Sequence, residues 1–260
     1  MTDKKKNILF AVVAYAIFWV LLIASVIIFA SNENLFPKVM AFDQIVGTWA
    51  PTFALLILFK KLYPDWTVGA FFRNAFKERL NFKLLLVVTV ALLVITAGIV
   101  GVGAFSQKVS FFSLLNFTFA GFLITLFSGA MGEESGWRGY LQQSVEKRHS
   151  LLRALLIVGI IWAFWHVPTW MNYITGGMPY LIPLDILDKI ALAFIIGICY
   201  NRCRNLLVPM WIHFVANMVV NGTQGTLIDY YVWYVLLEVL IAAGYIVWYL
   251  KSGKNTVAAA

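Results

Sequence analysis

Long apolar runs separated by short polar stretches dominate the chain, and they predict a protein built from membrane-spanning helices. The clearest run, residues 7–30, carries no charged side chain and follows three lysines at positions 4–6. At about 1.5 Å per residue, a helix of this length exceeds a hydrocarbon core of roughly 30 Å. Because the run is longer than the apolar part of a signal peptide and further runs follow it, we interpret it as an uncleaved first helix.

Seven further apolar segments follow, so we predict an all-α, polytopic integral membrane protein with about eight transmembrane helices. The segment that begins near residue 186 is the weakest, because it is short and starts with Asp188 and Lys189. No repeat or linker interrupts the chain, and we treat residues 1–260 as a single transmembrane domain with core helices over about 112–221. The predicted extents are 41–59, 84–106, 112–134, 152–170, 186–200, 206–221 and 230–250.

The basic residues predict the orientation of these helices. Eight crossings put 17 of the 20 Lys and Arg residues on the side of the two termini, and only Lys38, Lys108 and Lys189 on the other side. Basic residues accumulate in cytoplasmic loops, so both termini are expected in the cytoplasm of a multi-pass cell-membrane protein. The segment 64–83 mixes aromatic and basic residues, and this pattern predicts a helix lying in the cytoplasmic interface.

Composition supports this class and excludes several others. Hydrophobic residues make up 62% of the chain and charged residues 12%, against roughly 45–50% and 25% in soluble domains. Disordered chains and disulfide scaffolds are thereby excluded, and the net charge of +8 indicates contact with membrane lipids rather than nucleic acid. The two cysteines, Cys199 and Cys203, have a spacing that fits neither a zinc knuckle nor a redox pair, so we expect them to serve in packing.

Ionisable residues inside apolar segments need a partner or a function, because a charge at the bilayer centre costs at least a few kcal/mol. The end of the fourth segment carries Glu133, Glu134 and Arg138. Glu134 and Arg138 are four residues apart and can pair, which leaves Glu133 pointing elsewhere. Gly132 and Gly136 form a small-residue step that permits close approach of another helix.

Four more polar residues lie in three later segments. His166 lies in the fifth segment, two residues before Pro168, which can distort the helix. His213 and Asn217 are four residues apart in the seventh segment and project from one face. Glu238 stands alone in the eighth segment, and we expect it to have a structural partner on another helix.

The depths of these residues group Glu133, His166 and the pair His213 and Asn217 into one site. If the fourth and fifth segments form a helical hairpin, Glu133 and His166 lie at equal sequence distance from its turn, and His213 and Asn217 are at a similar depth. We therefore predict that three helices converge on a buried polar cavity that faces the cytoplasm.

Such a set of groups suits hydrolysis. A buried carboxylate beside a His can hold and deprotonate water, and His213 with Asn217 can donate hydrogen bonds to a developing oxyanion. A nucleophilic role for Ser135 is a weaker alternative, because its projection toward His166 is not implied by the spacing. A zinc site with Glu133, His166 and His213 as ligands is a stronger alternative. The spacing alone does not decide between zinc-dependent and metal-free hydrolysis.

The motifs E-E-x-x-x-R at residues 133–138, a His in the next segment and H-x-x-x-N at 213–217 resemble the CPBP intramembrane proteases. These include the type II CAAX prenyl endopeptidases and are also called the Abi family. The resemblance covers about 115–220 and has one departure, since the family has Phe four residues before the first His and this chain has Trp162.

The resemblance implies a mechanism and the roles of the site residues. Glu133 and His166 would activate a water, while His213 and Asn217 would form the oxyanion site. Residues of the same motifs would support the site, namely Glu134, Arg138 and Trp162. Family members cleave peptide bonds near the C-terminus of prenylated proteins, and they have been viewed both as metalloendopeptidases and as enzymes with a glutamate-activated water.

We therefore predict an intramembrane endopeptidase without a resident cofactor, with zinc as the alternative. Its substrate would be a hydrophobic or membrane-tethered peptide or protein, prenylated or unmodified. Two other functions stay open, a catalytically silent bacteriocin-immunity or regulatory protein of the same fold and a transporter that uses the same ionisable groups.

Overall fold

The computed structural model describes residues 2–223 and 226–252, and within these ranges the chain is helical without a β-strand. Helices satisfy all their backbone hydrogen bonds internally, which is why apolar membrane segments adopt them. The predicted all-α class is therefore confirmed. Lys254, which the charge argument counts, lies outside the described residues.

The helices follow one another without long connections. The α-helices are α1 (Asp3–Phe29), α2 (Phe36–Gly47), α3 (Ala50–Ile57), α4 (Phe59–Leu62), α5 (Val68–Ala75), α6 (Phe82–Gln107), α7 (Phe119–Thr125), α8 (Met131–Gly136), α9 (Gln143–Glu146), α10 (Leu151–Trp165), α11 (Met171–Thr175), α12 (Ile182–Cys203), α13 (Leu207–Gly222), α14 (Thr226–Asp229) and α15 (Tyr231–Lys251). Short 3-10 helices are η1 (Phe111–Leu114), η4 (Val167–Trp170) and η5 (Pro179–Leu181), and π-helical segments are η2 (Leu126–Ala130) and η3 (Trp137–Gln142).

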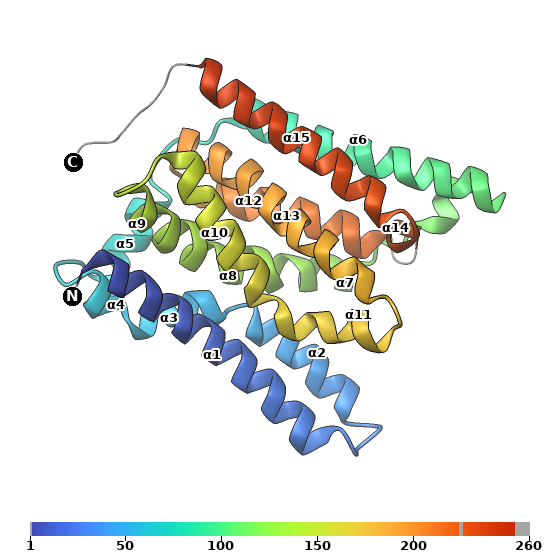
Figure 1. Cartoon of the computed structure of the whole chain (residues 1–260), viewed down its shortest axis with the longest axis horizontal. Helices are drawn as coiled ribbons and strands as arrows, with labels where there is room; N and C mark the ends of the chain where they lie inside the picture. The colour runs from blue at the N-terminus through green and yellow to red at the C-terminus, as the bar shows by residue number, and fades with distance from the viewer. Residues whose placement is uncertain (1, 224–225, 253–260) are drawn as a thin grey trace.

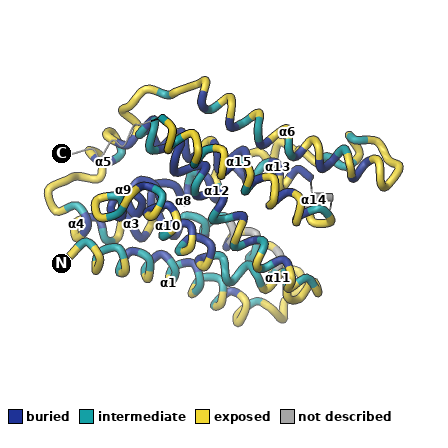
Figure 2. The backbone as a smooth tube through the Cα atoms, turned by 45° about the horizontal axis from the view of Figure 1, so that its top comes forward, coloured by how far each residue is buried: buried dark blue, intermediate teal, exposed yellow. Residues whose placement is uncertain are grey.

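The bundle has a central group of helices between two outer groups. Helices α8, α10, α12 and α13 form the middle, with α1 to α3 against one side and α6 with α15 against the other (Figure 1). The middle helices are the most deeply buried, whereas α1 and α6 expose their outer faces (Figure 2). On α1 the buried Phe10, Ala14 and Phe18 recur every four residues, while Ile27 on the opposite face is 77% exposed. Such apolar outer faces suit contact with lipid acyl chains.

The structure confirms that each predicted apolar segment contains helix, but it leaves the number of crossings open. Among the described residues, α1, α6 and α15 are long and apolar enough to cross a membrane, and two bent pairs raise this number to five if each is one span. The start of α1 and the end of α15 lie toward the same end of the molecule, as an even number of crossings requires (Figure 1). Eight crossings and cytoplasmic termini stay predictions.

Several segments predicted as single straight helices are interrupted. The segments 41–59 and 152–170 are each bent by 50°. The second bend coincides with Pro168, which has no N–H to continue the α-helical ladder. The segment 112–134 is divided at Ser128 and Gly129, where the backbone leaves helical dihedral angles.

Two other predicted extents are wrong. The segment predicted at 186–200 is the 22-residue helix α12, with Asp188 and Lys189 well inside the helix rather than at its start. The interfacial helix predicted over 64–83 is restricted to the eight residues of α5, and its Phe71 is buried in the core. Cys199 and Cys203 are free and buried, which confirms their role in packing.

Candidate active site

The segment that carries the two glutamates is held close to α3 by small residues. A methyl group on Gly132 would lie 2.8 Å from the carbonyl oxygen of Thr48, and one on Gly136 would lie 2.6 Å from Pro51. The hydroxyl of Thr52 donates a hydrogen bond to the carbonyl oxygen of Gly132 at 2.6 Å. The predicted close approach of another helix at Gly132 and Gly136 is therefore confirmed, and that helix is α3.

Glu133 is buried and is held by two indole groups. Its Oε2 accepts hydrogen bonds from Trp162 Nε1 at 2.6 Å and from Trp137 Nε1 at 3.2 Å. Trp162 lies on α10 and Trp137 at the start of η3, so two elements orient the carboxylate. The motif of the family that the sequence resembles has phenylalanine at the position of Trp162. Phenylalanine has no hydrogen-bond donor, so the indole N–H that binds Glu133 follows from this replacement.

Glu134 connects the motif to α13. Its Oε1 accepts from Arg138 at 2.9 Å and lies 2.7 Å from His213 Nδ1, and all three side chains are almost completely buried. The guanidinium of Arg138 also lies over the ring of Trp162, 4.5 Å from its centroid. The predicted pairing of Glu134 with Arg138 is confirmed. The contact with His213 was not predicted, and it orients the opposite ring nitrogen, Nε2, away from Glu134.

Three of the predicted site residues surround Gly129. A methyl group placed on this glycine would lie 2.7 Å from Asn217 Nδ2, 3.5 Å from Glu133 Oε1 and 3.5 Å from His213 Nε2. The carboxylate oxygen that faces this point is the one that accepts no indole hydrogen bond. The break in the helix at Gly129 thus leaves a small polar space among a carboxylate, an imidazole and an amide.

Gly129 is a sharp test of this arrangement. Its φ of +66° lies in the left-handed region, and a side chain there would also collide with Asn217. Gly129→Ala is therefore expected to lower the free energy of unfolding by about 1–3 kcal/mol and to abolish any activity of the site. Thermal unfolding in detergent measures the first effect. Gly98→Ala on α6, where a methyl group meets no atom within 4 Å, is the matched control and should leave the melting temperature unchanged or higher.

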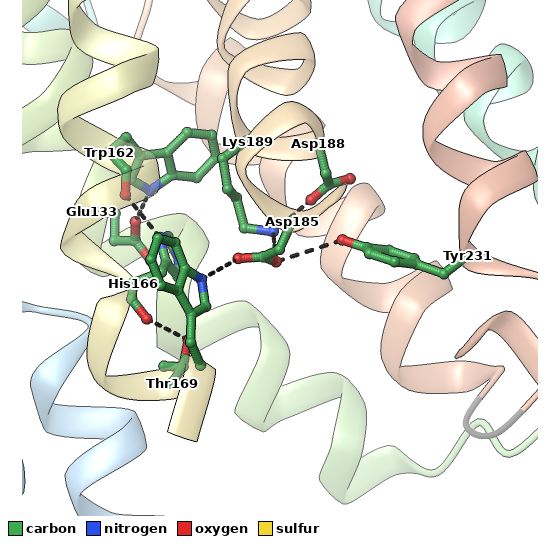
Figure 3. Close-up of polar contacts among 9 residues, drawn as sticks. Glu133, Trp162, His166, Thr169, Asp185, Asp188, Lys189 and Tyr231 are labelled. Carbon is green, nitrogen blue, oxygen red and sulfur yellow. Dashed lines mark hydrogen bonds and ion pairs between the residues drawn. The ribbon is translucent and has the colours of Figure 1, made fainter. Parts of the chain in front are cut away.

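His166 lies beside this group rather than at Gly129. It caps the C-terminus of α10, and its Nδ1 lies 2.8 Å from the carbonyl oxygen of Trp162. Its ring packs edge-on against Trp162, whose indole also donates to Glu133 (Figure 3). The same indole contacts the ring of His213. The structure therefore brings Glu133, His213 and Asn217 together directly, and His166 contacts Trp162, the residue that also contacts Glu133 and His213.

One observation bears on the alternative zinc site, which stays a prediction. Within residues 2–223 and 226–252, no three His, Cys, Asp or Glu side chains have an arrangement that could hold a metal ion. His166 Nδ1 faces a backbone carbonyl, His213 Nδ1 faces Glu134, and one oxygen of Glu133 accepts two indole hydrogen bonds, so a metal would have to use the other ring nitrogens and the other carboxylate oxygen.

A second polar cluster was missed in the sequence. Asp185, Asp188 and Lys189 form two ion pairs on α12, and both aspartates are buried. Their spacing of three and four residues places them on one helix face inside an apolar segment, and this was a signal for a built cluster. Glu238 is completely buried on α15 near the carboxylate of Asp188 on α12, and the structural partner predicted for it stays a prediction.

The cluster of Asp185, Asp188 and Lys189 lines a cavity of about 280 Å³, and Asn217 is also part of its lining. The walls include Asp185, Lys189 and Tyr231 and belong to the first turns of α12 and α15 and the last turns of α13. Helices α12 and α15 run from here to ends that carry Arg202 and Lys251. The cavity thus lies away from the basic helix ends, and the opening of the site to the cytoplasm stays a prediction.

Comparisons with known proteins point to one family. Residues 115–219 match the family described as Type II CAAX prenyl endopeptidase Rce1-like. A curated relative named CAAX prenyl protease 2, from Methanococcus maripaludis, is 25% identical over an alignment that covers 73% of this chain and 75% of the relative. The resemblance inferred from the motifs is thereby confirmed, and the matched region contains the three residues that surround Gly129.

Proposed function

From its similarity to the type II CAAX prenyl endopeptidases, we propose that the protein is a membrane-embedded endopeptidase that hydrolyses a peptide bond near the C-terminus of a hydrophobic or membrane-tethered peptide. The observation that carries the proposal is the convergence of Glu133 Oε1, His213 Nε2 and Asn217 Nδ2 on the space beside Gly129. These are the groups that hydrolysis by an activated water needs, namely a base and two donors for an oxyanion.

In the proposed reaction Glu133 Oε1 accepts a proton from a water molecule in this space. The hydroxide oxygen forms a bond to the carbonyl carbon of the peptide, and the carbonyl oxygen becomes an oxyanion. Asn217 Nδ2 donates a hydrogen bond to that oxyanion. The proton then passes from Glu133 to the leaving nitrogen as the C–N bond breaks, and the products are a carboxylic acid and an amine.

His213 would act as the second donor with the help of Glu134. A ring protonated on both nitrogens can donate from Nδ1 to Glu134 and from Nε2 to the oxyanion. The carboxylate of Glu134 compensates the ring charge, in the way that a buried aspartate supports the imidazolium of a serine protease. His166, which packs against the same indole of Trp162, would complete the activation of the water.

Cleavage of defined peptides tests the proposal. The purified protein in vesicles of neutral phospholipid is incubated with a farnesylated C-a-a-X peptide and with unmodified hydrophobic peptides, and mass spectrometry identifies the products. We expect cleavage at one bond close to the C-terminus of at least one of the two peptide classes. Folded protein that leaves every peptide intact would contradict the proposal and favour the catalytically silent alternative.

One observation favours a second candidate function, a transporter. The charged groups of α12, with Glu238, extend the polar interior beyond Asn217, and transport pathways are lined by such residues. Asp185, Asp188 and Lys189 are, however, already paired with one another. Peptide efflux from the same vesicles without hydrolysis would favour the transporter.

The proposed reaction uses no resident metal, and zinc held by Glu133, His166 and His213 is the alternative. Treatment with a chelator, followed by measurement of zinc by mass spectrometry and of peptide cleavage, is expected to leave the rate within about twofold of the untreated enzyme. Stoichiometric zinc that is lost and regained together with activity would show that this part of the proposal is wrong.

A further inference from the structure

The charged residues of α12 are costly in their position, and their contacts indicate what they do. Asp185 is 5% exposed, and Lys189 pairs with both Asp185 and Asp188. An ion pair within one helix turn does not require burial, because the same pair at a surface avoids the desolvation penalty. A contact from outside α12 is therefore needed to explain why these residues lie in the interior.

Asp185 provides that contact, because it joins three elements. Its Oδ2 accepts a hydrogen bond of 2.8 Å from Trp170 Nε1, and its Oδ1 is approached by Lys189 at 3.2 Å and by the hydroxyl of Tyr231 at 3.5 Å (Figure 3). Trp170 ends η4, Lys189 lies on α12 and Tyr231 begins α15. The carboxylate of Asp185 thus ties η4 to the central bundle.

The segment η4 needs such an anchor because the helical ladder stops at His166. The backbone bends by 50° between α10 and the residues that follow, and Pro168 lacks the N–H that would continue the helix. Beyond the bend, Thr169 donates from both its backbone N–H and its hydroxyl to the carbonyl oxygen of His166. His166 is therefore fixed on one side by α10 and on the other by η4, whose last residue is Trp170.

We propose that Asp185 is a positioning residue for His166, acting through the hydrogen bond from Trp170. Lys189 and Asp188 hold the Asp185 carboxylate in the orientation that accepts from the indole. The inference rests on the proposed function, since it assigns these residues to the placement of an imidazole that takes part in water activation. It explains why a paired cluster of charges is buried one helix away from the reacting groups.

Trp170→Phe tests the inference, because it removes one N–H and keeps an aromatic ring beside Phe164. We expect kcat for peptide cleavage to fall by about 10- to 100-fold, since a small misplacement of a reacting group has effects of this size, while KM changes by less than about threefold. Trp211→Phe is the matched control, because its indole donates to Thr89 on an exposed face, and it should keep the wild-type rate.

Two substitutions of Asp185 separate the hydrogen bond from mere packing. Asp185→Asn keeps an oxygen that can accept from Trp170 and should retain kcat within about threefold, whereas Asp185→Ala should lose as much as Trp170→Phe. Wild-type kcat in Trp170→Phe, an equal loss in Trp211→Phe, or a change confined to KM would overturn the inference. Failure of the proposed function is seen separately, as folded wild-type protein that leaves every peptide intact, whereas wild-type cleavage by His166→Ala would overturn this inference alone.

Discussion

Replacing Glu133 by glutamine is expected to lower kcat for peptide cleavage by about 10²- to 10⁴-fold, the usual contribution of a general base. The amide keeps the size of the side chain and an oxygen for the indole donors, so the fold should persist. It cannot accept a proton from water, because a primary amide is not a base near neutral pH. Single-turnover rates with a C-terminally labelled reporter peptide measure the effect.

The control for this variant is Glu146→Gln on α9, which lies in the same stretch of chain. Glu146 pairs with Arg204 and accepts a hydrogen bond from Gln142, remote from Gly129. A partly exposed pair contributes about 0–1 kcal/mol, so its loss should alter neither melting temperature nor rate noticeably. Glu133→Gln that cleaves as fast as Glu146→Gln would remove Glu133 from the role of base.

Replacing Asn217 by alanine is expected to lower kcat by about 10²- to 10³-fold, as loss of one oxyanion donor does in other acyl-transfer enzymes. Asn217 Nδ2 is the closest polar atom to the space beside Gly129. Its hydrogen bond would form mainly in the transition state, so KM should change little. Steady-state kinetics with the same peptide separate the two parameters.

Asn221→Ala is the matched control, because Asn221 lies one helical turn further along α13 and lines the same cavity. Its amide donates to Thr125 Oγ1 at 3.1 Å and not to the space at Gly129. We expect a rate within about threefold of wild type. Equal losses in the two variants would indicate a disturbed helix rather than a lost oxyanion donor.

Local relations within the site could be predicted from the sequence, because they depend on one helix at a time. The four-residue spacing of Glu134 and Arg138 gives the observed ion pair. The spacing of Gly132 and Gly136 gives the observed close approach to a neighbouring helix. The identity of that neighbour, α3, depends on how the helices pack in three dimensions, which spacing along the chain does not contain.

The relations between helices were harder to predict. Glu134 and His213 are 79 residues apart, and no periodicity pairs them. The break at Gly129 was equally hidden, because Gly98 and Gly101 lie inside the uninterrupted helix α6. A glycine alone therefore does not predict a break, and the tertiary contacts that favour one at Gly129 come from α8 and α13.

Equal depth of Glu133 and His166 requires regular helices on both sides of a hairpin. The chain between these residues contains the π-helical segment η3, which changes the rise per residue. Glu133 and His166 nevertheless contact the same residue, Trp162, so the grouping is useful although the depth calculation is not.

The most direct test of the account is the rate of the double variant Glu133→Gln/Asn217→Ala, compared with each single variant on the same peptide. If both residues act on one reacting carbonyl beside Gly129, removal of the base leaves little oxyanion for Asn217 to stabilise. We predict that the double variant cleaves within about threefold of Glu133→Gln alone, as for other residues that act as a unit. Full multiplication of the two losses would show independent action and contradict the shared site.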